Sequence, residues 1–154
     1  MHIVLNEINE NEFNNIQLPI LFEDKLTDRV FGIITYGENK FKISWQSFVS
    51  KPKILKLNNS ICSIGIDLVF VIANLLNGEI QLKLSLDYFF YDVKIYNEII
   101  FVITELEIIK IKRHDFIIIN TITLPDYFKE IKFTKDLIII ECINNEIIKM
   151  NYSS

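Results

Sequence analysis

The chain has 154 residues and a mass of 18.2 kDa, the size of one ordinary domain with a core of its own. Hydrophobic residues make up 50% of it and charged residues 23%, a composition that excludes a disordered chain. The net charge of −4 and the pI near 5.2 disfavour nucleic acid as a partner and favour a basic protein surface. Alanine occurs once, at Ala73, and isoleucine is abundant, which favours strands over helices.

Membrane insertion, secretion and disulfide bonding are all disfavoured. The longest nearly apolar run, IDLVFVIANLL, is much shorter than the roughly 20 residues that a membrane-spanning helix needs. Glu7, Glu10 and Glu12 lie where a secretory signal would be basic and then apolar. Cys62 and Cys142 are too few for a disulfide scaffold and are not clustered like zinc ligands. We therefore expect a cytoplasmic protein with two buried cysteines.

The N-terminal region is acidic and has little periodicity. HIVLNEI, from His2, is a candidate strand that could supply an outer strand missing from the last unit described below. For residues 9–28 we expect a loop with room for a short helix or strand. The acidic side chains could dock a basic partner, and the alternative is a merely solvated loop. The predicted partner-binding residues of this region are Glu7, Glu10, Glu12, Glu23, Asp24 and Asp28.

Strand signals follow directly. Residues 29–45, RVFGIITYGENKFKISW, predict a hairpin around Gly37. KILKL, from Lys53, predicts another strand. We expect Trp45, at the end of the hairpin, to anchor the core and not to hold a ligand.

An internal repeat dominates the second half of the chain. When Val93 is aligned with Ile131, 38 residues later, DVKIYNEIIFVIT matches EIKFTKDLIIIEC. With one added residue, EIIKIK from Glu107 then matches EIIKMN from Glu146. A looser copy begins at Cys62 with CSIGIDLVFVIAN and continues with GEIQLKL. A period of about 40 residues with several strands per unit is typical of propeller-type β arrays.

Each unit contains distinguishable strands. DVKI, EIIFVIT, LEIIKIK and DFIIINTIT predict four antiparallel strands joined by hairpin-length turns. The runs that begin at Leu68, Ile99 and Leu137 are apolar throughout, so we expect them to be covered on both faces. The strands that follow them mix isoleucine with lysine, so we expect these strands nearer the outside with one face partly wet. The lysines concerned are Lys110, Lys112 and Lys149.

The last unit, LPDYFKEIKFTKDLIIIECINNEIIKMN, resembles the blade repeats of β-propeller proteins. The resemblance covers residues 62–151 and lacks the Trp-Asp and Gly-His signatures of WD repeats. It implies an all-β fold, an antiparallel meander of repeated four-stranded units. Because common closed propellers have more blades than fit here, we expect a small or partial (half) β-propeller-like array. The predicted single domain is 1–154, with units at about 1–60, 61–91, 92–129 and 130–154.

Asp-Tyr-Phe occurs twice, each time just before the first strand of a unit. Equivalent positions of stacked units lie on one face, so the two copies would present paired aromatic and acidic clusters. Aromatic residues are enriched in the hot spots of protein interfaces. The alternative is that these rings close the core between units. The predicted partner-binding residues of the two copies are Asp87, Tyr88, Tyr91, Asp126 and Tyr127.

Motifs for catalysis and for cofactor or metal binding are missing from the sequence. His2 and His114 are the only imidazoles, and no GxSxG, GxxxxGKS or HExxH pattern occurs. Glu105 and Glu107 could serve as acid and base, but their spacing on a strand places both on one solvated face. We therefore expect no enzymatic activity, no catalytic residue, no cofactor and no metal.

The functional hypothesis is a protein that binds another protein without catalysis. Its specific version is a bacterial immunity protein that neutralises a basic, nuclease-type toxin by occluding the toxin's active site, an analogy at the level of class. Binding should weaken with salt, and the chain should be a monomer when unbound. Two alternatives stay open, a small-ligand-binding or enzymatic propeller-like domain and a self-assembling repeat module.

Overall fold

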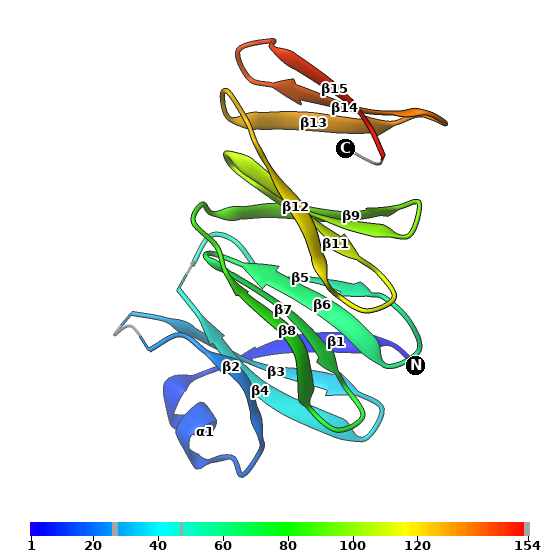
Figure 1. The fold of residues 1–154 in the computed structure, drawn as a ribbon. Coiled ribbons are helices and arrows are strands. Elements are labelled where there is room, and N and C mark those ends of the chain that lie inside the picture. Colours follow the sequence, from blue (N-terminus) through cyan, green and yellow to red (C-terminus); the bar gives the residue numbers. More distant parts are fainter. Residues whose placement is uncertain (26–27, 47, 153–154) are drawn as a thin grey trace. The chain divides into compact units, whose positions relative to one another are not determined.

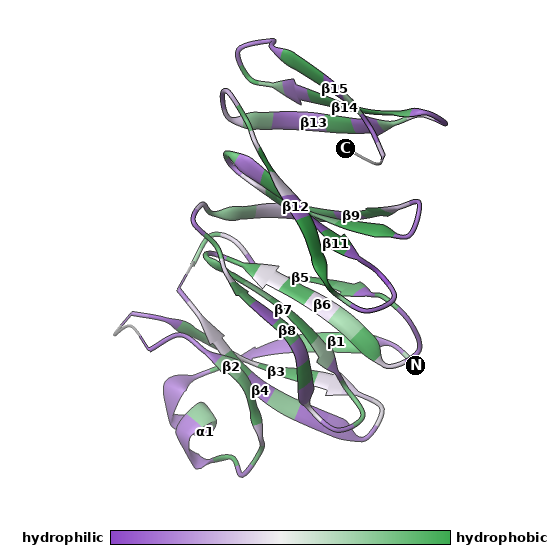
Figure 2. Ribbon diagram, viewed as in Figure 1, coloured by the Kyte–Doolittle hydropathy of each residue, from purple (hydrophilic) through white to green (hydrophobic). Residues whose placement is uncertain are grey.

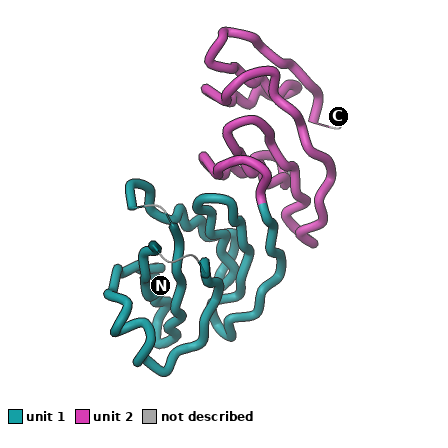
Figure 3. Tube along the Cα trace, turned by 90° about the vertical axis from the view of Figure 1, so that its left-hand side faces the viewer, with its two compact units in different colours: residues 1–85 teal, residues 86–154 magenta. Residues whose placement is uncertain are grey.

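The computed structural model describes residues 1–25, 28–46 and 48–152, and within them it is built from strands with one short helix (Figure 1). This confirms the predicted all-β class. The chain divides into two compact units, Met1–Ser85 and Leu86–Ser154 (Figure 3). Each unit contains two sheets. No helix in the described ranges is long and apolar enough to cross a membrane.

The first sheet is formed by β1 (Ile3–Ile8), β2 (Ile20–Glu23), β3 (Val30–Tyr36) and β4 (Asn39–Trp45). Its strand order is β1-β3-β4-β2. β3 and β4 form the predicted hairpin, and Gly37 in its turn has a φ of 62°, a left-handed conformation that glycine adopts without strain. β2 runs parallel to β4, an arrangement that the sequence did not predict.

β1 belongs to the first sheet, so the prediction that HIVLNEI completes the last unit is wrong. The strand pairs with β3, from Ile3 opposite Tyr36 to Ile8 opposite Phe31. Ile3 and Leu5 pack against the core of the first unit. Pairing with a strand close in the sequence also closes a shorter loop, which costs less chain entropy than pairing with the far end.

The short helix α1 (Glu10–Asn15) covers the outer face of the first sheet. Asn9 caps it, because its side chain accepts a hydrogen bond from the backbone N–H of Glu12 at 2.8 Å. Phe13 is only 2% exposed and packs on Phe31, with ring centroids 4.9 Å apart. The segment expected to be a loop therefore contains both α1 and β2, and its residues 26–27 lie outside the described residues.

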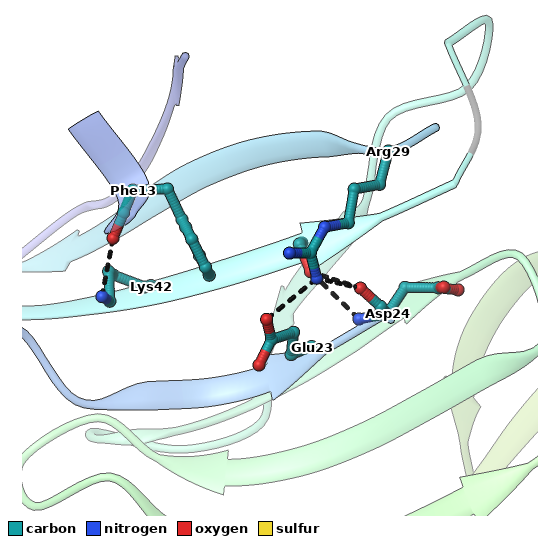
Figure 4. A network of polar contacts seen from close by, with 6 residues as sticks. Phe13, Glu23, Asp24, Arg29 and Lys42 are labelled. Atoms are coloured by element: carbon teal, nitrogen blue, oxygen red, sulfur yellow. Dashed lines mark hydrogen bonds and ion pairs between the residues drawn. The ribbon is translucent and has the colours of Figure 1, made fainter. Parts of the chain in front are cut away.

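Two cations surround the ring of Phe13 (Figure 4). The Nζ of Lys42 lies 4.7 Å from the ring centroid and donates a hydrogen bond to the Phe13 carbonyl at 2.7 Å. The Arg29 guanidinium lies 5.8 Å from the same ring and 4.9 Å from that of Phe31, and it pairs with Glu23 at 2.8 Å. Cation–π contacts of this kind stabilise by about 0.5–2 kcal/mol each, depending on desolvation. The helix is thus held on the sheet by cation–π contacts and a hydrogen bond as well as by the burial of Phe13.

The second sheet is an antiparallel meander in the order β5-β6-β7-β8. It shares one core with the first sheet, in which Trp45, Ile43 and Ile64 are almost completely buried. This confirms Trp45 as a core anchor. Cys62 is also fully buried in this core, and Cys142 is buried in that of the other unit, as predicted. The strands are β5 (Lys53–Lys56), β6 (Ile61–Ile66), β7 (Val69–Asn74) and β8 (Glu79–Ser85).

The second unit shows the repeat directly. The third sheet has the order β12-β11-β10-β9 and the fourth, with three strands, the order β13-β14-β15. Phe90 pairs with Thr104 in the third sheet, and Phe128 pairs with Cys142 in the fourth, each residue 38 positions from its counterpart. The strands are β9 (Phe90–Tyr96), β10 (Ile99–Thr104), β11 (Glu107–Lys112), β12 (Ile118–Thr123), β13 (Phe128–Phe133), β14 (Leu137–Cys142) and β15 (Ile147–Asn151).

The sheets extend over residues 3–45, 53–85, 90–123 and 128–151. β5 lies within residues 1–60, which were expected to form the first unit, and the expected unit boundaries stay predictions. β5 pairs with β6 across a short turn, so it belongs to the second sheet. The prediction of one single domain stays a prediction.

The apolar runs form interior strands, and β7 and β10 are buried on both faces as expected, whereas in β14 buried residues alternate with half-buried ones, so this strand is not covered on both faces. β7, β10 and β14 each have a partner strand on both sides, and the central residues of β7 and β10 are buried. Lys110 on β11 was expected near the outside, and this prediction is wrong, because its side chain is fully buried. Its Nζ donates a hydrogen bond to the carbonyl of Tyr152 at 3.2 Å, so the segment after β15 covers it. Lys149, on the edge strand β15, is exposed as expected.

The fourth sheet has two unlike faces, and polar and apolar residues alternate along β13 (Figure 2). Ile131, Ile138 and Ile140 pack into a core shared with the third sheet. The opposite face carries charged side chains, which form the ion pairs Lys132–Glu130 at 2.9 Å and Lys129–Glu141 at 3.2 Å.

Candidate functional site

Four exposed aromatic side chains lie at the start of β9 and β13 in the second unit. They are 36–53% exposed, although aromatic rings of this size are usually buried. We refer to them as the aromatic patch, and its members are Tyr88, Phe89, Tyr91 and Tyr127.

Backbone hydrogen bonds through Glu105 tie the two parts of the aromatic patch together. The N–H of Glu105 donates to the carbonyl of Phe89 at 3.0 Å, and the carbonyl of Glu105 accepts from the N–H of Phe128 at 2.8 Å. Phe128 is buried, and its ring lies 5.3 Å from that of Tyr91. The ring of Tyr91 therefore lies against a buried aromatic side chain, and backbone hydrogen bonds join the residues that precede the two strands.

β-Bulges set the direction of the chain at the patch. The pairing of β9 with β10 shifts between Phe90 and Asp92, which makes Tyr91 the extra residue. The pairing of β13 with β14 shifts in the same way at Lys129. Bulges commonly redirect side chains next to functional sites.

The two Asp-Tyr-Phe copies are not equivalent in the structure. Glu105 donates to Phe89 and Ile143 donates in the same way to Tyr127, and these positions differ by 38 residues. Phe89 therefore corresponds to Tyr127, and Asp126 corresponds to Tyr88, one residue away from the expected match. The prediction that Asp87 and Asp126 occupy equivalent positions in their units is therefore wrong.

The two aspartates consequently have different surroundings. The Oδ2 of Asp126 accepts a hydrogen bond from the N–H of Asn144 at 3.0 Å, so this half-buried carboxylate orders the turn between β14 and β15. Asp87 is exposed and lies near Glu107. Burial, and after it the charge of Asp87, raises the pKa of the Glu107 carboxyl above its ordinary value. A cation from a partner would relieve this repulsion.

The acidic residues of the N-terminal region lie in the first unit, apart from the aromatic patch in the chain. Several of them have partners within the unit. Glu23 pairs with Arg29, Glu7 lies 3.6 Å from Lys51, and Asp24 accepts a hydrogen bond from the Gln46 side chain at 2.7 Å. Glu12 accepts a hydrogen bond from the side chain of the cap residue, and Glu10 and Asp28 are exposed.

An open depression of about 380 Å³ lies beside these acids. Glu7 and Glu10 stand in its wall together with Phe31 and Phe48, and Phe48 is 73% exposed. Arg29 also lines it, so the charge of the depression is mixed and not purely acidic. The N-terminal acids thus lie on a surface of mixed charge, and their role in binding a partner stays a prediction.

The residues with catalytic potential are not assembled into a site. His114 is 72% exposed and lies 3.2 Å from the carboxylate of Asp115, and His2 is exposed near the N-terminus. Burial raises the pKa of the Cys62 thiol to about 12, which makes it a poor nucleophile. Among residues 1–25, 28–46 and 48–152, no group of three His, Cys, Asp or Glu side chains could hold a metal.

The structure adds Phe89 and Glu107 to the predicted residues. Phe89 was part of the repeated phrase, and the structure shows that it is 50% exposed just before β9. Glu107 was interpreted as a solvated strand residue, and its proximity to Asp87 arises from the fold. In the sequence, the only sign of a role for Glu107 was its negative charge.

No family model and no curated protein matches the chain. Among solved structures it is similar to Sqt1 from Saccharomyces cerevisiae, with 13% identity, a TM-score of 0.51, and coverage of 83% of this chain and 43% of Sqt1. It is also similar to the computationally designed protein Ika4, with 8% identity, a TM-score of 0.53, and coverage of 89% and 93%. Hsv2 from Kluyveromyces marxianus gives 14% identity, a TM-score of 0.50, and coverage of 88% and 49%.

The chain therefore spans less than half the length of Sqt1 and of Hsv2. Both are propeller-type proteins, and with the four sheets they show that this chain has a β-propeller-like fold. Within the described residues no sheet closes on itself. The predicted fold class is confirmed.

Proposed function

We propose that the chain is a non-catalytic protein-binding module and that it binds its partner through the aromatic patch. The observation that carries the proposal is the exposure of four aromatic rings at the start of two strands whose first residues are joined by backbone hydrogen bonds. Tyrosine rings that are held in place lose little conformational entropy on binding, and they dominate the energetics of many interfaces. The propeller-like fold is compatible with such a role and does not specify the partner.

The acids at the patch indicate the chemistry of the partner. Asp87 directly precedes Tyr88 in the chain and its charge acts on Glu107, so a lysine or arginine side chain placed near these two carboxylates would gain from both. The overall charge of −4 would steer a basic partner towards the chain. A basic partner is therefore supported both by the carboxylates of Asp87 and Glu107 and by the net charge of the chain.

The finer proposal is an immunity protein that occludes the active site of a basic, nuclease-type toxin. It is supported by the small size, the acidity, and the lack of an assembled catalytic group in the described residues. A toxin that holds phosphate with lysine and arginine would present the charges that this patch can bind.

Co-expression with the product of the neighbouring upstream gene tests the proposal. We expect a co-purifying complex that weakens with salt, chiefly through slower association. The double variant Tyr88→Ala with Tyr91→Ala should weaken it by at least about tenfold. The matched control, Phe48→Ala, removes another exposed ring in the first unit and should leave the affinity unchanged.

A complex that forms equally well with the double variant would contradict the aromatic patch. A complex that is insensitive to salt would contradict the basic partner. Rescue of growth against a co-expressed toxin would establish the finer proposal, and a complex without toxicity or rescue would overturn it while leaving the binding module intact.

A further inference from the structure

The four sheets have eight edge strands, and in the part of the chain that the structure describes seven of them contain a charged residue. Charged side chains on an edge, lysine above all, prevent pairing with other chains. β12 is the exception, because its sequence, Ile-Ile-Asn-Thr-Ile-Thr, is uncharged. This edge of the third sheet lacks the usual protection.

The residues at this edge are also unusually apolar for a surface. Ile117, Ile118 and Ile119 are 56%, 44% and 39% exposed. Together they make the longest run of consecutive exposed isoleucines among the described residues. Among the described residues β12 pairs in its sheet with β11 alone, so its other edge carries backbone groups that have no strand partner there.

The pairing with β11 shows which groups are available. The N–H of Leu124 donates to the carbonyl of Leu106 at 2.9 Å, and the register continues with Ile122 opposite Ile108. Residues in an antiparallel pair alternate between bonding to the neighbour and pointing away from it. The backbone N–H and carbonyl groups of Thr121 therefore point outwards.

We propose that β12 is a strand-addition surface whose occupant is a second copy of this chain, paired antiparallel through the same strand. The occupant is argued from charge. A second β12 is also uncharged, so a symmetric pair brings no like charges together, whereas two copies of β15 would place Lys149 near Lys149. A pair centred on Asn120 also sets Ile118 of one copy opposite Ile122 of the other.

The contact is small. Two six-residue strands bury far less than the roughly 1,600 Å² of a standard stable interface, so the dimer is weak and forms only at high concentration. The proposal is independent of the aromatic patch. It departs from the monomer expected from the sequence, and one measurement decides between the two.

Sedimentation velocity at concentrations up to about 1 mM tests the proposal, because dimers of millimolar affinity become populated there. We expect the sedimentation coefficient of the wild type to rise with concentration. Thr121→Lys, which adds a protecting charge to the edge, should remain a monomer throughout, and so should Thr123→Lys. The matched control Gln81→Lys adds the same charge to the exposed edge strand β8 and should behave like the wild type.

A wild type that stays monomeric at the highest concentration would overturn the proposal. So would association that survives both Thr121→Lys and Thr123→Lys in variants with unchanged circular dichroism. Association lost equally in Gln81→Lys would show that net charge, and not β12, controls it.

Discussion

Tyr96 on β9 stacks against Phe133 on β13, with ring centroids 4.8 Å apart and 8° between the ring planes. Tyr152 lies against the same tyrosine ring at 5.5 Å. The third and fourth sheets are thus joined by three successive aromatic rings at the ends of β9 and β13. The aromatic patch lies at the starts of the same two strands.

Tyr96→Ala should destabilise the second unit by about 2 kcal/mol, because it removes two stacked contacts, each of about 0.5–1.5 kcal/mol. Tyr96→Phe keeps the ring and should cost much less. Urea unfolding followed by circular dichroism measures both. Equal losses for the two variants would show that the hydroxyl group, and not the stack, is responsible.

Phe13→Ala should cost about 3–5 kcal/mol, the usual loss for a buried phenylalanine, and should release α1 from the first sheet. Lys42 would also lose its ring contact. Phe48→Ala serves as a control, because its ring is 73% exposed and should change stability by less than about 0.5 kcal/mol. Chemical denaturation compares the two, and similar losses would contradict the anchoring role of Phe13.

Lys110→Met should alter the dependence of stability on alkaline pH. Burial lowers the pKa of Lys110 in the folded state, so the native chain binds fewer protons than the unfolded chain between that pKa and 10.5. The contribution of Lys110 to the free energy of unfolding of the wild type should therefore increase as pH rises through this window. Methionine has no titrating group, and the difference between the two proteins should follow the rise. A difference independent of pH would mean that Lys110 titrates normally.

Glu107→Gln should stabilise the chain at neutral pH. The pKa of Glu107 is raised, so the native state binds more protons than the unfolded state just above pH 4.5, and its contribution to stability falls as pH rises through that window. Glutamine removes this loss. Glu105→Gln is the control, and thermal unfolding from pH 4 to pH 7 compares them. A parallel pH profile for wild type and Glu107→Gln would contradict the expected shift.

Glu107 also provides a readout of binding. A lysine or arginine placed beside Glu107 and Asp87 would lower the raised pKa, so complex formation would release a proton and affinity would rise with pH across the same window. Calorimetry in buffers of different ionisation enthalpy measures the proton release. No release would place the basic side chains of the partner elsewhere.

Much of the fold could be predicted from the repeat. The match of Val93 with Ile131 gave the correct strands in the second unit, because identical patterns of apolar residues must bury the same faces. Alternation along HIVLNEI indicated a strand but could not indicate its partner, and β1 pairs with β3. Patterns define which residues are buried, whereas pairing depends on the chain entropy of each possible loop.

The site was harder to predict than the fold. Tyr88, Tyr91 and Tyr127 are exposed, as a role in partner binding requires. Phe128 is buried, as the alternative of closing the core between units requires. A β-bulge shifts the strand register by one residue at the start of β9 and of β13, and no local sequence pattern predicted either bulge. Lys110 was misplaced because a lysine suggests solvent, and only the returning segment at Tyr152 explains its burial.

Two sheet faces, one in each unit, restrict where a further repeat could pack: the face of the first sheet under α1 and the charged face of the fourth sheet. Copying an internal unit next to the first sheet would require displacing α1 and exposing Phe13. Copying one next to the fourth sheet would bury Lys132, Glu130 and their charged neighbours against an apolar strand, which costs several kcal/mol for each unpaired ion. A repeat added by gene duplication next to either of these two faces would therefore need compensating substitutions on that face at the same time.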